Sequence, residues 1–264
     1  MSRLDGCLRA LRERGEKALI PFVTAGDPDL DTTEAVVLAL VEAGADAIEI
    51  GVPFSDPIAE GPTIQRASER ALASGTSLRR VIERVAALRA RVELPLILMG
   101  YTNNFLTMGA RPFATTAAAA GVDGLIIVDL PPEEGEEFYT EVMEAGIDRI
   151  LLAAPTTEAP RLEMLAVETR GFLYFVSLTG VTGARADVSA TLEKEMRSVR
   201  SISDVPVCVG FGVSTPEQAR RVAEFADGVV VGSAFIDRIE SAASRDAAVD
   251  AAASFAAELK AALR

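Results

Sequence analysis

Short apolar runs alternate with longer segments of helical periodicity along almost the whole chain. The apolar runs are rich in β-branched residues and bounded by Gly, Pro or Asp, which is typical of strands. They predict eight strands, at residues 18–24, 47–52, 95–100, 124–130, 149–153, 172–177, 206–210 and 228–232. The amphipathic segments predict helices at 31–43, 78–92, 132–144, 158–169, 189–201, 216–225 and 245–263, with an extra leading helix at about 4–14.

The junction between a helix and the next strand recurs with similar residues. It reads Ala-Gly-x-Asp at residues 43–46, 120–123 and 145–148, and a weaker form occupies residues 225–229. In each case a helical segment ends near a glycine or alanine and an apolar run follows at once. The repetition indicates a chain built from αβ units.

Nearly continuous apolar strands that alternate with helices favour a parallel sheet covered on both faces. Eight such units in 264 residues predict a single (β/α)8 TIM-barrel domain over residues 1–264, with the leading helix closing the bottom of the barrel. The alternative is a doubly wound open sheet. That fold favours a Gly-x-Gly-x-x-Gly turn after the first strand, where this chain has Thr24-Ala25-Gly26-Asp27-Pro28.

Composition narrows the class of partner. The chain is 49% hydrophobic, and its 26 basic and 39 acidic residues give a net charge of −13, which disfavours nucleic acid and anionic membranes. We find neither a signal-peptide pattern nor an apolar run long enough to span a bilayer, so a cytoplasmic location is expected. The two cysteines, Cys7 and Cys208, are expected to be reduced thiols.

The chain has no histidine, and its only lysines are Lys17, Lys194 and Lys260. The commonest metal ligand and general base is therefore missing, and none of the lysines follows a predicted strand, where a Schiff-base nucleophile would lie. Acid–base chemistry must then use carboxylates and tyrosines, and we expect no metal.

Glu49 is the strongest candidate for such chemistry. Alternation along its strand places Ile48, Ile50 and Val52 toward the helices and turns Glu49 into the barrel between small residues. Loss of solvent there is expected to raise its pKa. A structural glutamate satisfied by buried donors is the alternative, but no lysine lies near it in sequence.

The connection after this strand, residues 53–62, carries two more carboxylates in a proline-stiffened loop. Asp56 is equally compatible with a turn-forming role and a role in a site. Glu60 follows an apolar pair and is expected to fold back over the mouth of the barrel.

Glycine-rich turns after the seventh and eighth strands predict a phosphate site. They are Gly210-Phe211-Gly212-Val213-Ser214 and Gly232-Ser233-Ala234, the second followed by a short helix. Glycines let backbone N–H groups close around an anion, and TIM barrels often bind phosphate at these two loops. The longer connection at residues 178–188 is interpreted as a lid.

These segments, in order along nearly the whole chain, resemble the alpha subunit family of tryptophan synthase. The matching stretches are residues 20–28, 49–57, 180–184, 210–212 and 232–233. The resemblance implies cleavage of indole-3-glycerol phosphate to indole and glyceraldehyde 3-phosphate, without metal or organic cofactor. It also implies a beta-subunit partner in an α2β2 complex, contacted by the loop around Pro53 and Asp56 together with the 178–188 loop.

The resemblance further assigns roles by position. Glu49 would shuttle protons between the substrate hydroxyl and indole C3, and Glu60 would stabilise the indole N–H. Tyr174 matches an active-site tyrosine. The other implied residues are Phe22, Leu125 and Ile127 as walls for the indole, Thr182 in the lid, and Gly183, Gly212, Gly232 and Ser233 at the phosphate.

The chain departs from the family pattern at Glu60, where the family has Asp, and at Asn104, where proline is usual. The extra methylene moves the carboxylate by roughly 1.5 Å, a misplacement that can cost about 100-fold in rate. Two alternatives therefore stand beside the main hypothesis: a free-standing indole-producing lyase, and a weakly active or non-catalytic barrel that binds the partner. Phosphate-binding barrel isomerases are disfavoured by the match in the carboxylate-bearing loop at residues 53–62, called the acid loop below.

Overall fold

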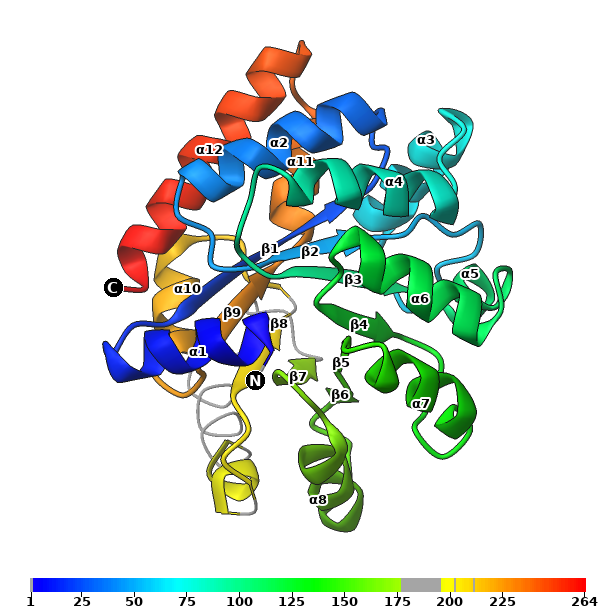
Figure 1. Cartoon of the computed structure of the whole chain (residues 1–264). Helices are drawn as coiled ribbons and strands as arrows, with labels where there is room; N and C mark the ends of the chain where they lie inside the picture. Colours follow the sequence, from blue (N-terminus) through cyan, green and yellow to red (C-terminus); the bar gives the residue numbers. More distant parts are fainter. Residues whose placement is uncertain (1, 177–195, 202, 211) are drawn as a thin grey trace.

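The computed structural model describes residues 2–176, 196–201, 203–210 and 212–264 and consists of parallel strands surrounded by helices (Figure 1). The strands are β1 (Ala18–Thr24), β2 (Ile48–Gly51), β3 (Leu96–Gly100), β4 (Gly124–Ile127), β5 (Asp148–Arg149), β6 (Leu152–Ala153), β7 (Leu173–Val176), β8 (Val207–Gly210) and β9 (Gly228–Val231).

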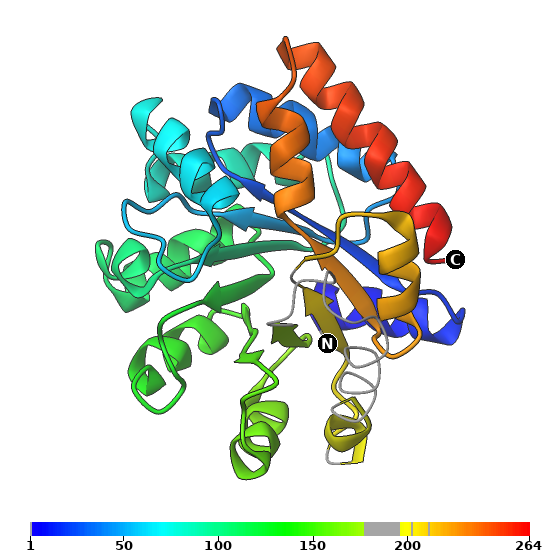
Figure 2. The same cartoon turned by 180° about the vertical axis from the view of Figure 1, so that it is seen from behind.

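Helices follow most of the strands and lie outside the sheet in both views (Figure 2). They are α1 (Arg3–Glu13), α2 (Leu30–Glu42), α3 (Pro62–Ala73), α4 (Leu78–Arg89), α5 (Thr102–Leu106), α6 (Ala110–Ala120), α7 (Glu136–Glu144), α8 (Ala159–Glu168), α10 (Pro216–Ala223), α11 (Ser233–Glu240) and α12 (Arg245–Ala262). A further helical stretch covers residues 196–201.

The sheet closes on itself through one short segment. Its strand order is β5-β4-β3-β2-β1-β9-β8-β7-β6, and its two ends, β5 and β6, are separated by only Ile150 and Leu151. The first half of this segment pairs with β4 and the second half with β7. The predicted fifth strand, 149–153, is therefore split between two neighbours, and the predicted eight-stranded TIM barrel is confirmed.

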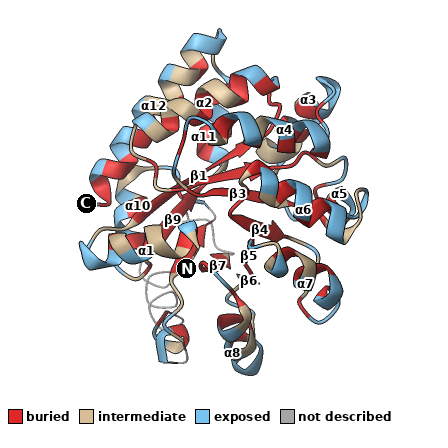
Figure 3. Ribbon diagram, viewed as in Figure 1, coloured by how far each residue is buried: buried red, intermediate tan, exposed pale blue. Residues whose placement is uncertain are grey.

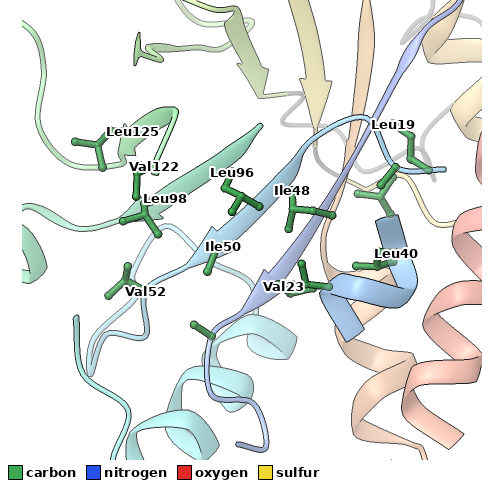
Figure 4. Packing of buried hydrophobic residues seen from close by; sticks show 14 of the residues in the cluster. Leu19, Val23, Leu40, Ile48, Ile50, Val52, Leu96, Leu98, Val122 and Leu125 are labelled. Carbon is green, nitrogen blue, oxygen red and sulfur yellow. The ribbon is translucent and has the colours of Figure 1, made fainter. Parts of the chain in front are cut away.

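The strands are buried along nearly their whole length (Figure 3). One apolar layer lies outside the barrel of strands and another lies inside it. The outer layer joins the strands to the helices and includes Ile48, Ile50 and Leu98 (Figure 4). The inner layer fills the barrel, and Leu4, Leu8 and Leu11 of α1 belong to it. This contact confirms that the leading helix closes the barrel, and Ser2 and Asp5 begin that helix with a capping box.

The aspartates of the recurring junction lock adjacent strands together. Asp46 accepts the N–H of Leu19 at 2.7 Å, Asp123 accepts that of Leu96 at 2.8 Å, and Asp227 accepts that of Val207 at 3.0 Å. Each carboxylate thus satisfies a backbone donor at the entry of the neighbouring strand. Arginines or a lysine pair with the same carboxylates and tie the helices to this end of the barrel.

The structure differs from the predicted elements in several places. Helices α3, α5 and α6 were not predicted, and the predicted strand 124–130 ends at Ile127, where the chain turns. The first half of the predicted helix 189–201 lies outside the described residues. No helix in the described part of the chain combines the length and apolarity needed to cross a membrane.

Candidate active site

A cavity of about 230 Å³ opens where the strands end and the loops begin. Strands β1, β2, β3, β7 and β9 each contribute an inward side chain to its wall, and the loops after β2, β8 and β9 surround its mouth. The described residues that line it are Phe22, Glu49, Glu60, Gly61, Ile64, Met99, Tyr174, Gly212, Val213, Ser214, Val230, Gly232, Ser233, Ala234, Asp237 and Arg238.

Glu49 lies on the cavity wall and is 1% exposed. Its Oε2 has no hydrogen-bond partner among the described residues. Burial, with a smaller contribution from the charge of Glu60, raises the pKa of Glu49 to about 8. The inward orientation and the raised pKa predicted from the strand alternation are therefore confirmed.

Small residues beside Glu49 make room for the cavity wall. At Gly51 a Cβ atom would lie 2.5 Å from Cζ of Phe22, so only glycine lets the aromatic ring occupy this space. Phe22 is paired in register with Glu49 across β1 and β2. The phenyl ring and the carboxyl group consequently share one side of the cavity.

Glu60 also reaches the cavity, as predicted from its loop. Burial raises the pKa of its carboxyl group to about 7. The two carboxyl groups therefore titrate near neutral pH, and the charge of one disfavours ionisation of the other.

The loop that carries Glu60 is held by two side chains that follow β3. The Ala59 N–H donates to Oη of Tyr101 at 3.0 Å, and Asn104 Nδ2 donates to the carbonyl oxygen of Pro53 at 3.1 Å. The Tyr101 N–H in turn donates to Asn104 Oδ1 at 2.9 Å, and the Tyr101 ring stacks on Phe54 with 5.0 Å between centroids. This clamp was missed from the sequence, although the unusual Asn104 had been noticed.

Tyr174 lies beneath the same cavity on β7 and is 6% exposed. Burial is the main cause that raises the pKa of its phenol well above 10, so the hydroxyl stays protonated and can donate a hydrogen bond. A Cβ atom at Gly210 would lie 2.2 Å from Tyr174 Oη. The glycine on β8 thus leaves the space that the phenol occupies.

The prediction that two residues form the wall around the indole is wrong. Leu125 and Ile127 belong to the outer layer between sheet and helices, and Figure 4 shows Leu125 beside Leu98 and Val122. Strand register explains the error, because Gly51 pairs with Met99 and Met99 pairs with Ile126. Met99 and Ile126 therefore continue the inward-facing row of β2, and their neighbours Leu125 and Ile127 face the helices. The apolar wall is formed instead by Met99, Ile64 and Val230 together with Phe22.

The predicted phosphate residues Gly212, Gly232 and Ser233 meet at the cavity. Gly212 has φ +78°, a conformation that favours glycine. Gly232 is the N-cap residue of α11, and Ser233 is its first residue. The first amides of a helix have no partner within it, so they can bind an anion. Thr182 and Gly183 lie outside the described residues.

The two predicted partner-contact residues differ in accessibility. Pro53 is buried at the base of the acid loop, and its carbonyl oxygen accepts the hydrogen bond from Asn104. Asp56 is exposed, and nearby Ile58 is 78% exposed. The tip of the loop, rather than its base, presents the accessible surface.

Comparisons with known proteins agree with one another. A family model described as tryptophan synthase alpha chain matches residues 8–264. The tryptophan synthase alpha chain of Geobacter sp. (strain M21) is 54% identical over 240 residues, which cover 91% of this chain and 90% of the relative. The crystal structure of tryptophan synthase subunit alpha from Legionella pneumophila str. Paris superposes with a TM-score of 0.91 at 40% identity, covering 100% of this chain and 98% of that one.

A chain in the aminoacrylate-bound structure of tryptophan synthase from M. tuberculosis superposes with a TM-score of 0.88 at 36% identity, and the match covers 100% of both chains.

Proposed function

This chain belongs to the tryptophan synthase alpha chain family, and from that premise we propose that Glu49 and Glu60 together drive its lyase reaction. The reaction cleaves indole-3-glycerol phosphate to indole and glyceraldehyde 3-phosphate. The observation that carries the assignment is a buried carboxyl group, without a hydrogen-bond partner among the described residues, on a cavity that is also lined by Gly212 and by the start of helix α11.

Glu49 is the proton carrier. With a pKa of about 8 it is mostly protonated at pH 7, so it can give its proton to indole C3 and then, as a carboxylate, take the proton of the side-chain hydroxyl. The C–C bond breaks as that hydroxyl becomes the aldehyde, and the bonding electrons return to the indole ring. The carboxyl group ends the cycle protonated, so no other proton source is required.

Glu60 stabilises the charge that forms on the ring. When C3 gains a proton, positive charge develops at the indole N–H, and an ionised carboxylate that accepts this N–H lowers the energy of that state. Its pKa of about 7 leaves a substantial ionised fraction at neutral pH. The longer side chain is accommodated by a loop that Tyr101 and Asn104 hold in place.

The remaining roles follow from position in the cavity. Phe22, Met99 and Ile64 enclose the indole, the Tyr174 hydroxyl donates toward the reacting groups, and Gly212, Gly232 and Ser233 hold the phosphate. The beta subunit is the partner, and the exposed loop tip at Asp56 and Ile58 is proposed as part of that contact. A cytoplasmic setting and a single-domain organisation belong to the same proposal.

An indole-release assay with indole-3-glycerol phosphate, run with and without a beta subunit, tests the proposal. Wild type should release indole alone and faster with the partner. Glu49→Gln should release none while still binding glycerol 3-phosphate. Turnover by Glu49→Gln would refute the proton-carrier assignment. A steep rise of turnover from near zero in Glu60→Asp would show instead that Glu60 marks an inactive barrel.

A further inference from the structure

The charges around the cavity are unbalanced for a substrate that carries phosphate. Among the described lining residues, Glu49, Glu60 and Asp237 are acidic and Arg238 is the only basic one. The chain as a whole has a net charge of −13. Glu49 is mostly protonated at pH 7, so the negative charge beside the cavity comes from Asp237 and the ionised fraction of Glu60. These charges and the negative net charge of the chain repel a phosphate dianion, and backbone amides supply only partial charges against that repulsion.

Arg238 is held beside the start of α11. Its Nη1 donates to the carbonyl oxygen of Ala234 at 2.6 Å, one turn back toward the helix N-terminus. Its guanidinium carbon lies 3.5 Å from the centroid of the Phe255 ring on α12. These contacts direct the charge toward the first turn of α11, where Ser233 and Ala234 line the cavity.

Among the described residues, no carboxylate forms an ion pair with Arg238. No acidic group of the described residues lies within 4.0 Å of its guanidinium, whereas Arg66 and Arg70 on α3 both form ion pairs with Glu240. The adjacent Asp237 is exposed and its carboxylate accepts a hydrogen bond from the Thr63 hydroxyl. Arg238 is thus a half-buried cation on the cavity wall, and Nη1 is the donor of its guanidinium that has an acceptor among the described residues.

We propose that Arg238 binds the phosphate group of the substrate from the side of α11 and supplies the positive charge that the backbone amides lack. The inference rests on the proposed function, because it assumes that the phosphate lies at Gly212, Gly232 and Ser233. Guanidinium groups form charge-assisted hydrogen bonds to phosphate oxygens, and the Phe255 ring holds this one in a fixed orientation.

The test uses glycerol 3-phosphate as the probe and isothermal titration calorimetry on the whole chain. Arg238→Gln should bind it about tenfold more weakly than wild type. Its affinity should also depend less on salt between about 50 and 500 mM NaCl, a range over which the Debye screening length falls from about 14 to about 4 Å. Arg238→Lys should retain part of the affinity. Arg111→Gln, which removes an exposed arginine paired with Glu141 on the outer surface, is the matched control and should bind as wild type does.

Kinetics separate binding from a merely structural role. Because the phosphate lies away from the bond that breaks, Arg238→Gln should raise KM for indole-3-glycerol phosphate about tenfold and leave kcat nearly unchanged. Arg238→Met keeps an apolar stem against Phe255 and should behave like Arg238→Gln, which covers the case in which the glutamine variant folds poorly.

Wild-type affinity and salt dependence in both uncharged variants would overturn the inference, as would a fall in kcat with unchanged KM. If wild type binds glycerol 3-phosphate but releases no indole, the proposed function fails while the binding test of Arg238 still stands. If wild type cleaves the substrate and the uncharged variants lose no affinity, only the inference about Arg238 fails.

Discussion

Replacing Glu49 with glutamine should stabilise the fold while it abolishes turnover, and the stabilisation should grow with pH. The pKa of Glu49 is about 8 in the folded chain against an ordinary value of 4.5. A carboxyl group with a higher pKa in the folded state takes up a proton on folding. Its presence therefore weakens folding as the pH rises from the unfolded pKa toward the folded one.

The magnitude follows from this difference in pKa. Each pH unit between 4.5 and 8 costs about 1.4 kcal/mol, because one pKa unit corresponds to that free energy. The cost is about 1 kcal/mol at pH 5, about 3 kcal/mol at pH 7 and about 5 kcal/mol above pH 8, where it levels off. Glutamine has nearly the shape of the protonated side chain and does not ionise, so the variant avoids this pH-dependent cost.

Urea denaturation of wild type and Glu49→Gln at pH 5, 7 and 9 measures the effect. The advantage of the variant in free energy of unfolding should increase by about 4 kcal/mol from pH 5 to pH 9. Glu163→Gln on α8, at an exposed position, is the matched control and should show no comparable trend. A difference between Glu49→Gln and wild type that is independent of pH would refute the argument that Glu49 is buried without a compensating partner.

Three further predictions concern the loop and the opposite end of the barrel. The pH profile of kcat/KM should be bell-shaped with its maximum between about 7 and 8, because the reaction needs an ionised Glu60 and a protonated Glu49. Glu60→Gln should slow the reaction, remove the acid limb and move the alkaline limb to lower pH, because the charge of Glu60 raises the pKa of Glu49. An unchanged alkaline limb would contradict this coupling. Asn104→Ala should lower kcat about tenfold with little change in melting temperature, since it frees the loop at Pro53; unchanged kcat would exclude the clamp. Asp123→Ala should destabilise the fold by about 3 kcal/mol or more in urea denaturation, because it leaves the buried N–H of Leu96 without an acceptor and removes the ion pairs with Arg3 and Arg89. A loss below about 1 kcal/mol would contradict that role.

The candidate site was predicted as far as single strands and loops define it. Glu49 points inward because a strand alternates, and Gly212, Gly232 and Ser233 meet because equivalent loops of a barrel lie at one end. The prediction that Leu125 and Ile127 line the cavity failed because the inward-facing row of one strand depends on its register with the next strand. A shift of one residue exchanges the two faces of a strand. Arg238 was missed because its charge matters only once α11 is packed against α12.

What the sequence determined by itself is the order of the αβ units, the carboxylates available for proton transfer and the absence of histidine, since these depend on residue type and local period. Tertiary structure decided the pKa values of Glu49 and Glu60, because these depend on how much water the surrounding strands and loops exclude. It also decided that Tyr101 and Asn104 hold the acid loop, because these contacts join loops that follow different strands and that no local pattern brings together.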